Sequence, residues 1–150
     1  MYGDTEVIRR RVTALRDQGA GVRALADELV ARVEGLGWTG RAAEAMRERV
    51  TDRARHLRTA ADRHLTAADA LAGHAEAVDA TADEIATIRT RVTALVADAQ
   101  ARIAAIAARN EGYDGPQVTP DPHDEALAAF VAPPPGHRDW LTVDIPGLER

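Results

Sequence analysis

The sequence predicts an all-α protein, an antiparallel helical hairpin whose second helix is much longer than its first. Composition is the first reason: aromatic residues make up 3% of the 150 residues, against 45% apolar overall, and an apolar fraction of mostly Ala, Val, Leu and Ile suits close helix–helix packing. Two long segments also repeat apolar residues at helical spacing. Finally, a glycine-rich break at residues 35–40 separates these segments.

The first segment predicts a helix over residues 4–36. Asp4 and Thr5 are good N-cap residues, and Glu6 follows in the first turn, where the helix dipole favours an acid. The apolar positions are spaced alternately by four and three residues, which is typical of a helix packed as in a coiled coil. They are Ile8, Val12, Leu15, Gly19, Val22, Ala26, Leu29, Val33 and Leu36.

Gly19 interrupts this apolar row, and two interpretations stay open. A glycine in a helix interior costs roughly 1 kcal/mol relative to Ala, so Gly19 can be a tolerated weak point. Alternatively, the backbone of a neighbouring helix approaches closely at this position.

The break at residues 35–40 predicts a tight turn that contains a tryptophan. Gly35, Gly37 and Gly40 supply the positive φ angles that such a connection needs. We expect Trp38 to cover the open end of the helix pair with its ring, and its indole N–H to reach a carbonyl group or water.

The second segment holds a seven-residue repeat, which predicts left-handed supercoiling around a partner helix. One row of the repeat is expected to form an interface seam and contains Ala43, Val50, Leu57, His64, Leu71, Val78, Ile85, Val92, Ala99 and Ile106. A companion row of small residues implies that the helix axes come close, and contains Ala54, Ala61, Ala68, Ala75 and Ala82.

Gly73 decides how this segment is divided. It is the only glycine between residues 41 and 110, where proline is absent. A fold-back at Gly73 would give a three-helix bundle, but the repeat passes through without a phase jump. We therefore favour one continuous helix, whose residues 74–110 would then need an external partner.

The composition changes after residue 110, so we expect a helical hairpin over 1–110 and a proline-rich, partly disordered tail over 111–150. Asp121 and Pro122 predict the start of a short helix near 122–131. The prolines at 133–135 end it. Residues 140–145 alternate weakly in polarity and could form an extended docking segment.

Charge and composition exclude several classes of protein. The net charge of −5 argues against a nucleic-acid partner. No apolar run is long enough for stable membrane insertion, and the N-terminus lacks the features of a signal peptide. If the protein is secreted, we expect a route without a cleavable signal peptide, with the protein cytoplasmic before export.

Chemical sites are weakly supported, and we expect no enzyme activity, cofactor or metal. The sequence has no cysteine, phosphate-binding loop or nucleophile elbow. His56 and His64 alone do not indicate a metal site. His64 and His74, on or beside the seam, either fix the helix register or make an interface pH-dependent.

The Trp38-Thr39-Gly40 triplet between two amphipathic helices resembles the motif of the WXG family, small helical hairpins exported by type VII (ESX-like) secretion. Gly3-Asp4 and residues 42–46 resemble the longer actinobacterial versions, and the likeness covers roughly residues 3–107. It implies that Trp38 and Gly40 form a turn and secretion motif, and that two hairpins pair into a four-helix bundle. The implied partners are a second WxG-type protein in a homodimer or heterodimer, a secretion ATPase, or a cargo toxin.

The sequence departs from the family at the export signal, Tyr-x-x-x-Asp/Glu, expected just beyond the second helix. Tyr113 is followed four places later by Gln117, and Tyr2 and Glu6 fit the spacing only at the opposite end of the chain. Export is therefore expected to depend on a partner that carries the signal. The alternatives are an intracellular structural coiled-coil adaptor and the leader domain of a larger secreted toxin.

Overall fold

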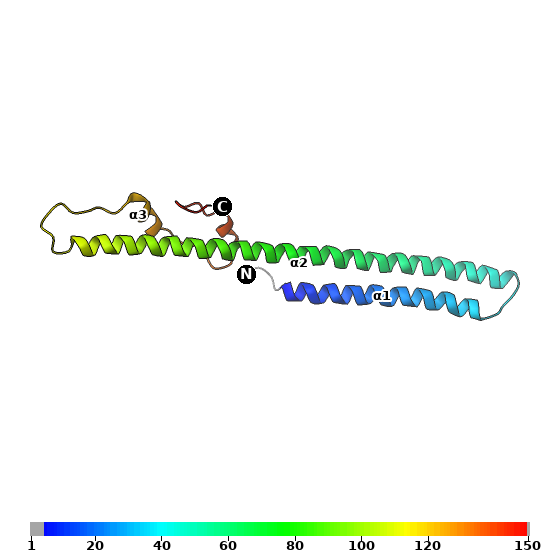
Figure 1. Cartoon of the computed structure of the whole chain (residues 1–150). Coiled ribbons are helices and arrows are strands. Elements are labelled where there is room, and N and C mark those ends of the chain that lie inside the picture. The colour runs from blue at the N-terminus through cyan, green and yellow to red at the C-terminus, as the bar shows by residue number, and fades with distance from the viewer. Residues whose placement is uncertain (1–4, 150) are drawn as a thin grey trace. The chain divides into compact units, whose positions relative to one another are not determined.

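The computed structural model describes residues 5–149 and is helical throughout its regular structure (Figure 1). Its elements are α1 (Thr5–Gly35), α2 (Arg41–Asn110), α3 (Pro122–Ala128) and the 3₁₀ helix η1 (Arg138–Thr142). The predicted all-α class and the helical hairpin are confirmed. The described residues divide into two compact parts, which we call the hairpin unit (5–78) and the tail unit (79–149).

In the hairpin unit, α1 runs antiparallel to the first part of α2 (Figure 1). Mostly small residues form the contact between them. The buried positions are seven residues apart on each helix: Val12, Gly19 and Ala26 on α1, and Ala54, Ala61, Ala68 and Ala75 on α2. These four alanines are at most 2% exposed. The expected close approach of the axes therefore occurs along the companion row, whereas Val50, Leu57, His64, Leu71 and Val78 of the predicted seam are half-buried.

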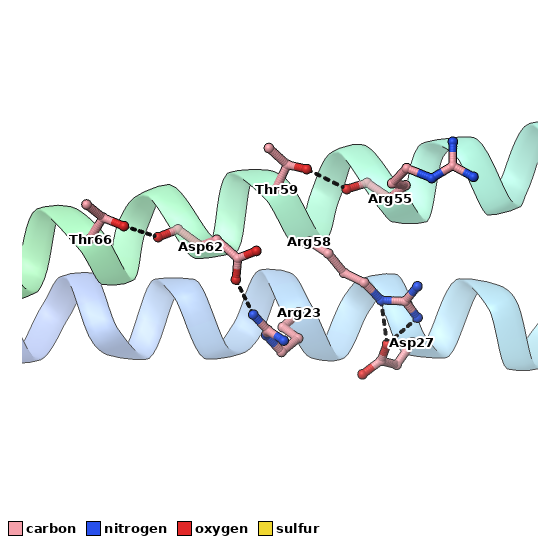
Figure 2. Close-up of polar contacts among 7 residues, drawn as sticks. All are labelled: Arg23, Asp27, Arg55, Arg58, Thr59, Asp62 and Thr66. Carbon is pink, nitrogen blue, oxygen red and sulfur yellow. Dashed lines mark hydrogen bonds and ion pairs between the residues drawn. The ribbon is translucent and has the colours of Figure 1, made fainter.

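Three ion pairs on the surface of the hairpin unit define its register, and Figure 2 shows two of them, Arg23 with Asp62 and Arg58 with Asp27. The three pairs join Arg16 with Asp69 at 3.1 Å, Arg23 with Asp62, and Arg58 with Asp27 at 2.6 Å. From one pair to the next, the position on α1 advances by seven or four residues and the position on α2 falls by the same number. All three pairs therefore fit one alignment of the two helices. Each pair is largely exposed and contributes at most about 1 kcal/mol, so the pairs specify alignment more than stability.

The two helices approach each other closely at Gly19, where a side chain would be tightly accommodated. A Cβ atom on Gly19 would lie 3.2 Å from the carbonyl oxygen of Ala61 and 3.3 Å from Cβ of His64. Of the two interpretations of Gly19, close backbone approach is the one that the structure supports.

The second helix is continuous through Gly73, so the fold-back and the three-helix bundle are excluded. A Cβ atom on Gly73 would meet nothing within 4 Å. The helix ends agree with expectation to within a few residues. The proposed N-cap at Asp4 lies outside the described residues, and Thr5 is the first residue of α1.

In the tail unit, the chain after α2 folds back along residues 79–110 of that helix (Figure 1). Ile85 and Val92 of α2 form an apolar core with Trp140 and Val143. The expectation that the seam over 74–110 lies open for an external partner is therefore wrong at Ile85 and Val92. Farther along the seam, Ala99 is buried and Ile106 is half-buried.

Two details of the tail differ from expectation. The segment around residues 140–145, expected to be extended, contains η1, and the tail is folded onto α2 where partial disorder was expected. The short helix α3 ends at Ala128, three residues early, and is capped as predicted: Asp121 accepts a hydrogen bond from the backbone N–H of His123 at 2.8 Å, with Pro122 at the first helical position.

Candidate functional site

The turn between α1 and α2 uses glycines where its backbone requires positive φ angles, and an arginine hydrogen-bonds to it. Gly37 and Gly40 have φ angles of 60° and 96°, which residues with a Cβ rarely adopt. The carbonyl of Gly40 accepts hydrogen bonds from the N–H groups of Ala43 and Glu44 at 3.0 and 3.1 Å and so starts α2. Arg47 donates a hydrogen bond to the carbonyl of Trp38. Gly35, expected to share the positive φ, is instead the last residue of α1.

Trp38 projects from this turn into solvent. Trp38 is 57% exposed, and the neighbouring Leu36 and Met46 are 47% and 40% exposed. The expectation that the Trp38 ring covers the open end of the helix pair is not decided by this exposure, since Trp38 also lines a hollow with Val33 and Ala43 at the ends of the two helices. Covering an exposed aromatic side chain with a partner surface is favourable, which makes Trp38 a candidate binding residue.

A groove of about 540 Å³ lies beside Trp38 along the first turns of α2. Its lining is apolar apart from two arginines and comprises Trp38, Ala42, Ala45, Met46, Arg49, Val50 and Arg53. Trp38 and Met46 also line a smaller hollow with Val33 and Leu36. The surface therefore combines apolar contact area with positive charge, the composition typical of protein-binding hot spots.

Sequence reasoning identified only part of this surface. It predicted Trp38, Gly40 and Val50, but it did not assign Arg49 and Arg53 to the site. The missed signal is spacing: positions 46, 49, 50 and 53 follow the i, i+3, i+4, i+7 pattern of one helix face directly after the turn.

The predicted seam residues do not come together in one site. Val50 lines the groove, the seam residues from Leu57 to Val78 are half-buried in the hairpin unit, and Ile85 and Val92 are buried in the tail unit. His64 lies against Gly19 in the helix contact. Tyr113, at the position where the family's export signal was sought, is 59% exposed.

Other kinds of site find little support in residues 5–149. That part of the chain contains no cluster of three or more His, Cys, Asp or Glu side chains placed to hold a metal ion. Within the same range, none of the helices has the length and apolar character needed to cross a membrane.

The fold and the exposed turn together define a small helical-hairpin protein whose candidate site is an open surface. A family model described as "Putative T7SS secretion signal domain", where T7SS denotes the type VII secretion system, matches residues 1–131. The chain belongs to this family. The match spans α1, α2 and α3, whereas η1 lies beyond it. The expected relation to type VII secretion is thereby confirmed at the level of the family.

No curated protein and no solved structure matched the chain.

Proposed function

We propose that this protein is a non-enzymatic substrate or partner of a type VII secretion system, and that the turn at Trp38 with its groove is the surface it presents for recognition. It leaves the cell without a cleavable signal peptide. The family match supports the link to secretion. The exposure of Trp38 on the turn between α1 and α2 is the single observation that carries the choice of surface.

The energetics favour this surface as a binding site. In the free protein the turn already has the conformation in which Gly37 and Gly40 have positive φ angles, and Arg47 hydrogen-bonds to the carbonyl of Trp38, so Trp38 is presented for docking without a change of fold. Covering the exposed part of a tryptophan ring is worth roughly 2 to 3 kcal/mol at the usual coefficient for apolar area. Arg49 and Arg53 at the groove add a preference for a partner segment with acidic groups.

The hairpin unit is also proposed to pair with a second helical hairpin of the WxG type, as a homodimer or heterodimer. The half-buried row from Val50 to Val78 supports this, because it leaves apolar area that a further helix could cover. The secretion ATPase and a cargo toxin are the other proposed partners of the exported complex.

The experiment that tests the proposal is the export of a Trp38→Ala variant into the culture medium. Because Trp38 is 57% exposed, its removal should lower the stability of the protein by no more than about 2 kcal/mol and leave the hairpin folded. We expect normal amounts of the variant inside the cell and a loss of export of about tenfold or more. Leu25→Ala is the matched control, since Leu25 is similarly exposed, at 49%, on α1.

Two results would count against the proposal. Export of Trp38→Ala at the level of the unaltered protein would exclude Trp38 from recognition. An equal loss in Leu25→Ala and Trp38→Ala would show that export is sensitive to any change of the hairpin surface and would remove the special role of the turn.

A further inference from the structure

The apolar core of the tail unit forms between a helix and a segment that is mostly not helical. Ile85 and Val92 of α2 are 2% and 1% exposed, and Trp140 and Val143 on and after η1 are 2% and 7% exposed. Half-buried apolar residues surround this core, namely Ile88, Val96, Phe130, Leu141, Ile145 and Leu148. The tail thus buries a continuous apolar strip of α2.

The covered strip has the pattern of a helix-binding seam. Ile85, Val92 and Ala99 are seven residues apart, and a seven-residue apolar repeat is the pattern by which one helix packs against another. In the tail unit its occupant is η1 and the turns around it. A helical partner would match this repeat over a longer stretch than a five-residue 3₁₀ helix can.

Side chains, rather than a backbone ladder, attach the tail. The indole N–H of Trp140 donates to the carbonyl of Pro134 at 2.9 Å, which fixes the ring within the tail itself. Arg91 of α2 donates to the carbonyl of Glu149 at 3.2 Å. Arg102 of α2 donates to both carboxylate oxygens of Asp124 in α3 at 2.9 and 2.6 Å. Trp140 is the largest apolar group that the tail contributes, so its burial is the main anchor.

We propose that residues 132–149 form a built-in cover that closes the seam at Ile85 and Val92, and that removing the cover lets two copies of this chain pair through that seam. A second copy is the occupant because an uncovered heptad row is complementary to itself. In the covered state this apolar strip cannot contribute to association. This inference does not depend on the proposed role in secretion.

The test compares full-length Trp140→Ala with the unaltered protein by sedimentation at several concentrations. We expect Trp140→Ala to self-associate more strongly than the unaltered protein, through one additional interface. Its dissociation constant for self-association should be lower by about tenfold or more. Far-ultraviolet circular dichroism should show that the helical content is retained. Val131→Ala is the matched control, because Val131 lies directly before this segment but is 87% exposed, so its substitution should leave association unchanged.

A second variant and a peptide show whether the added association uses the proposed seam. Val92→Glu in the Trp140→Ala background should abolish it, because a charge then lies on the exposed strip. A synthetic peptide of residues 132–149, added in trans, should suppress it, and the same peptide with Trp140→Ala should not. Unchanged association of Trp140→Ala, or added association that Val92→Glu leaves intact, would overturn the proposal.

Discussion

Gly19 and Gly21 lie two residues apart in α1 and have opposite surroundings. A Cβ atom on Gly19 would press on the carbonyl oxygen of Ala61, part of a helix backbone that cannot move alone, whereas a Cβ atom on Gly21 would meet nothing within 4 Å. The same substitution should therefore have opposite effects at the two positions.

We predict that Gly21→Ala raises the free energy of unfolding by about 0.5–1 kcal/mol, the usual gain for removing a helix-interior glycine. Gly19→Ala should lower it by about 1–2 kcal/mol, because the helices must separate to admit the methyl group. Urea denaturation of both variants measures the difference. Similar gains at both positions would show that the helices do not approach closely at Gly19.

The two tryptophans show what a sequence reveals about single residues. Glycine spacing predicted the turn correctly, and Gly37 and Gly40 do have positive φ angles. The burial of the tryptophans was less predictable: Trp38 is more than half exposed, and Trp140, in a tail expected to be partly disordered, is 2% exposed. Burial of a tryptophan depends on chain segments distant in sequence, which local patterns do not encode.

Among the elements, α3 is joined to α2 by the ion pair between Arg102 and Asp124. The Asp124 side chain is 12% exposed. Its pKa lies below the ordinary value of 3.8, chiefly because Arg102 donates hydrogen bonds to the carboxylate and secondarily because of the positive charges of Arg102 and His123, while desolvation opposes the shift. The pair therefore stabilises the docking of α3 only while Asp124 is ionised.

This shift predicts an acid-dependent loss of stability. The folded pKa is lower than the unfolded one, so the stabilisation is fully present above pH 3.8 and is lost as the pH falls through the folded pKa. Asp124→Asn should lower the melting temperature at neutral pH, and its difference from the unaltered protein should shrink in strong acid. Thermal unfolding from about pH 7 to about pH 2 measures this.

Asp69→Asn is the control for that experiment. Asp69 pairs with Arg16 at 3.1 Å, but its side chain is 74% exposed, so removing its charge should change the melting temperature little at any pH. A difference between Asp124→Asn and the unaltered protein that stays constant with pH would show that the effect is unrelated to ionisation of Asp124.

The elements themselves were largely predictable, for physical reasons. The seven-residue repeat continues through Gly73 without a phase jump, and α2 is continuous there. Asp121 followed by Pro122 predicted the start of α3 correctly, because an N-cap carboxylate and a first-turn proline act locally. The 3₁₀ helix was missed, since its apolar residues serve a packing contact with a distant part of the chain.

At the scale of the whole molecule, each compact unit contains one tryptophan. Trp38 belongs to the hairpin unit and Trp140 to the tail unit. Their exposures of 57% and 2% differ enough for fluorescence to report on each unit separately.

We predict that the two single-tryptophan variants respond differently to acrylamide. Trp140→Phe, which keeps only Trp38, should show quenching several-fold stronger than Trp38→Phe, which keeps only Trp140. In urea the two constants should become equal, because both rings are then in solvent. Similar constants in the absence of urea would contradict the burial of Trp140 under the folded tail.

Sequence patterns showed that residues 74–110 carry an apolar row in need of a cover, but not what covers it. The tail held the matching signal, since Trp140, Leu141, Val143 and Ile145 concentrate apolar residues in a short segment. The two segments are separated by about fifty residues, and their pairing is a tertiary contact that neither segment specifies alone. An external partner was therefore expected for a strip that the chain partly covers itself.

The row of buried alanines in the hairpin unit has a mechanical consequence. Ala54, Ala61, Ala68 and Ala75 form successive layers along the contact, and each contributes little apolar area. A force that separates residue 5 from residue 78 loads these layers one after another, beginning far from the turn, so the helices unzip instead of shearing together. Resistance to such a pull is set by single layers in turn and not by their sum, and the Trp38 turn is the last part of the hairpin to open.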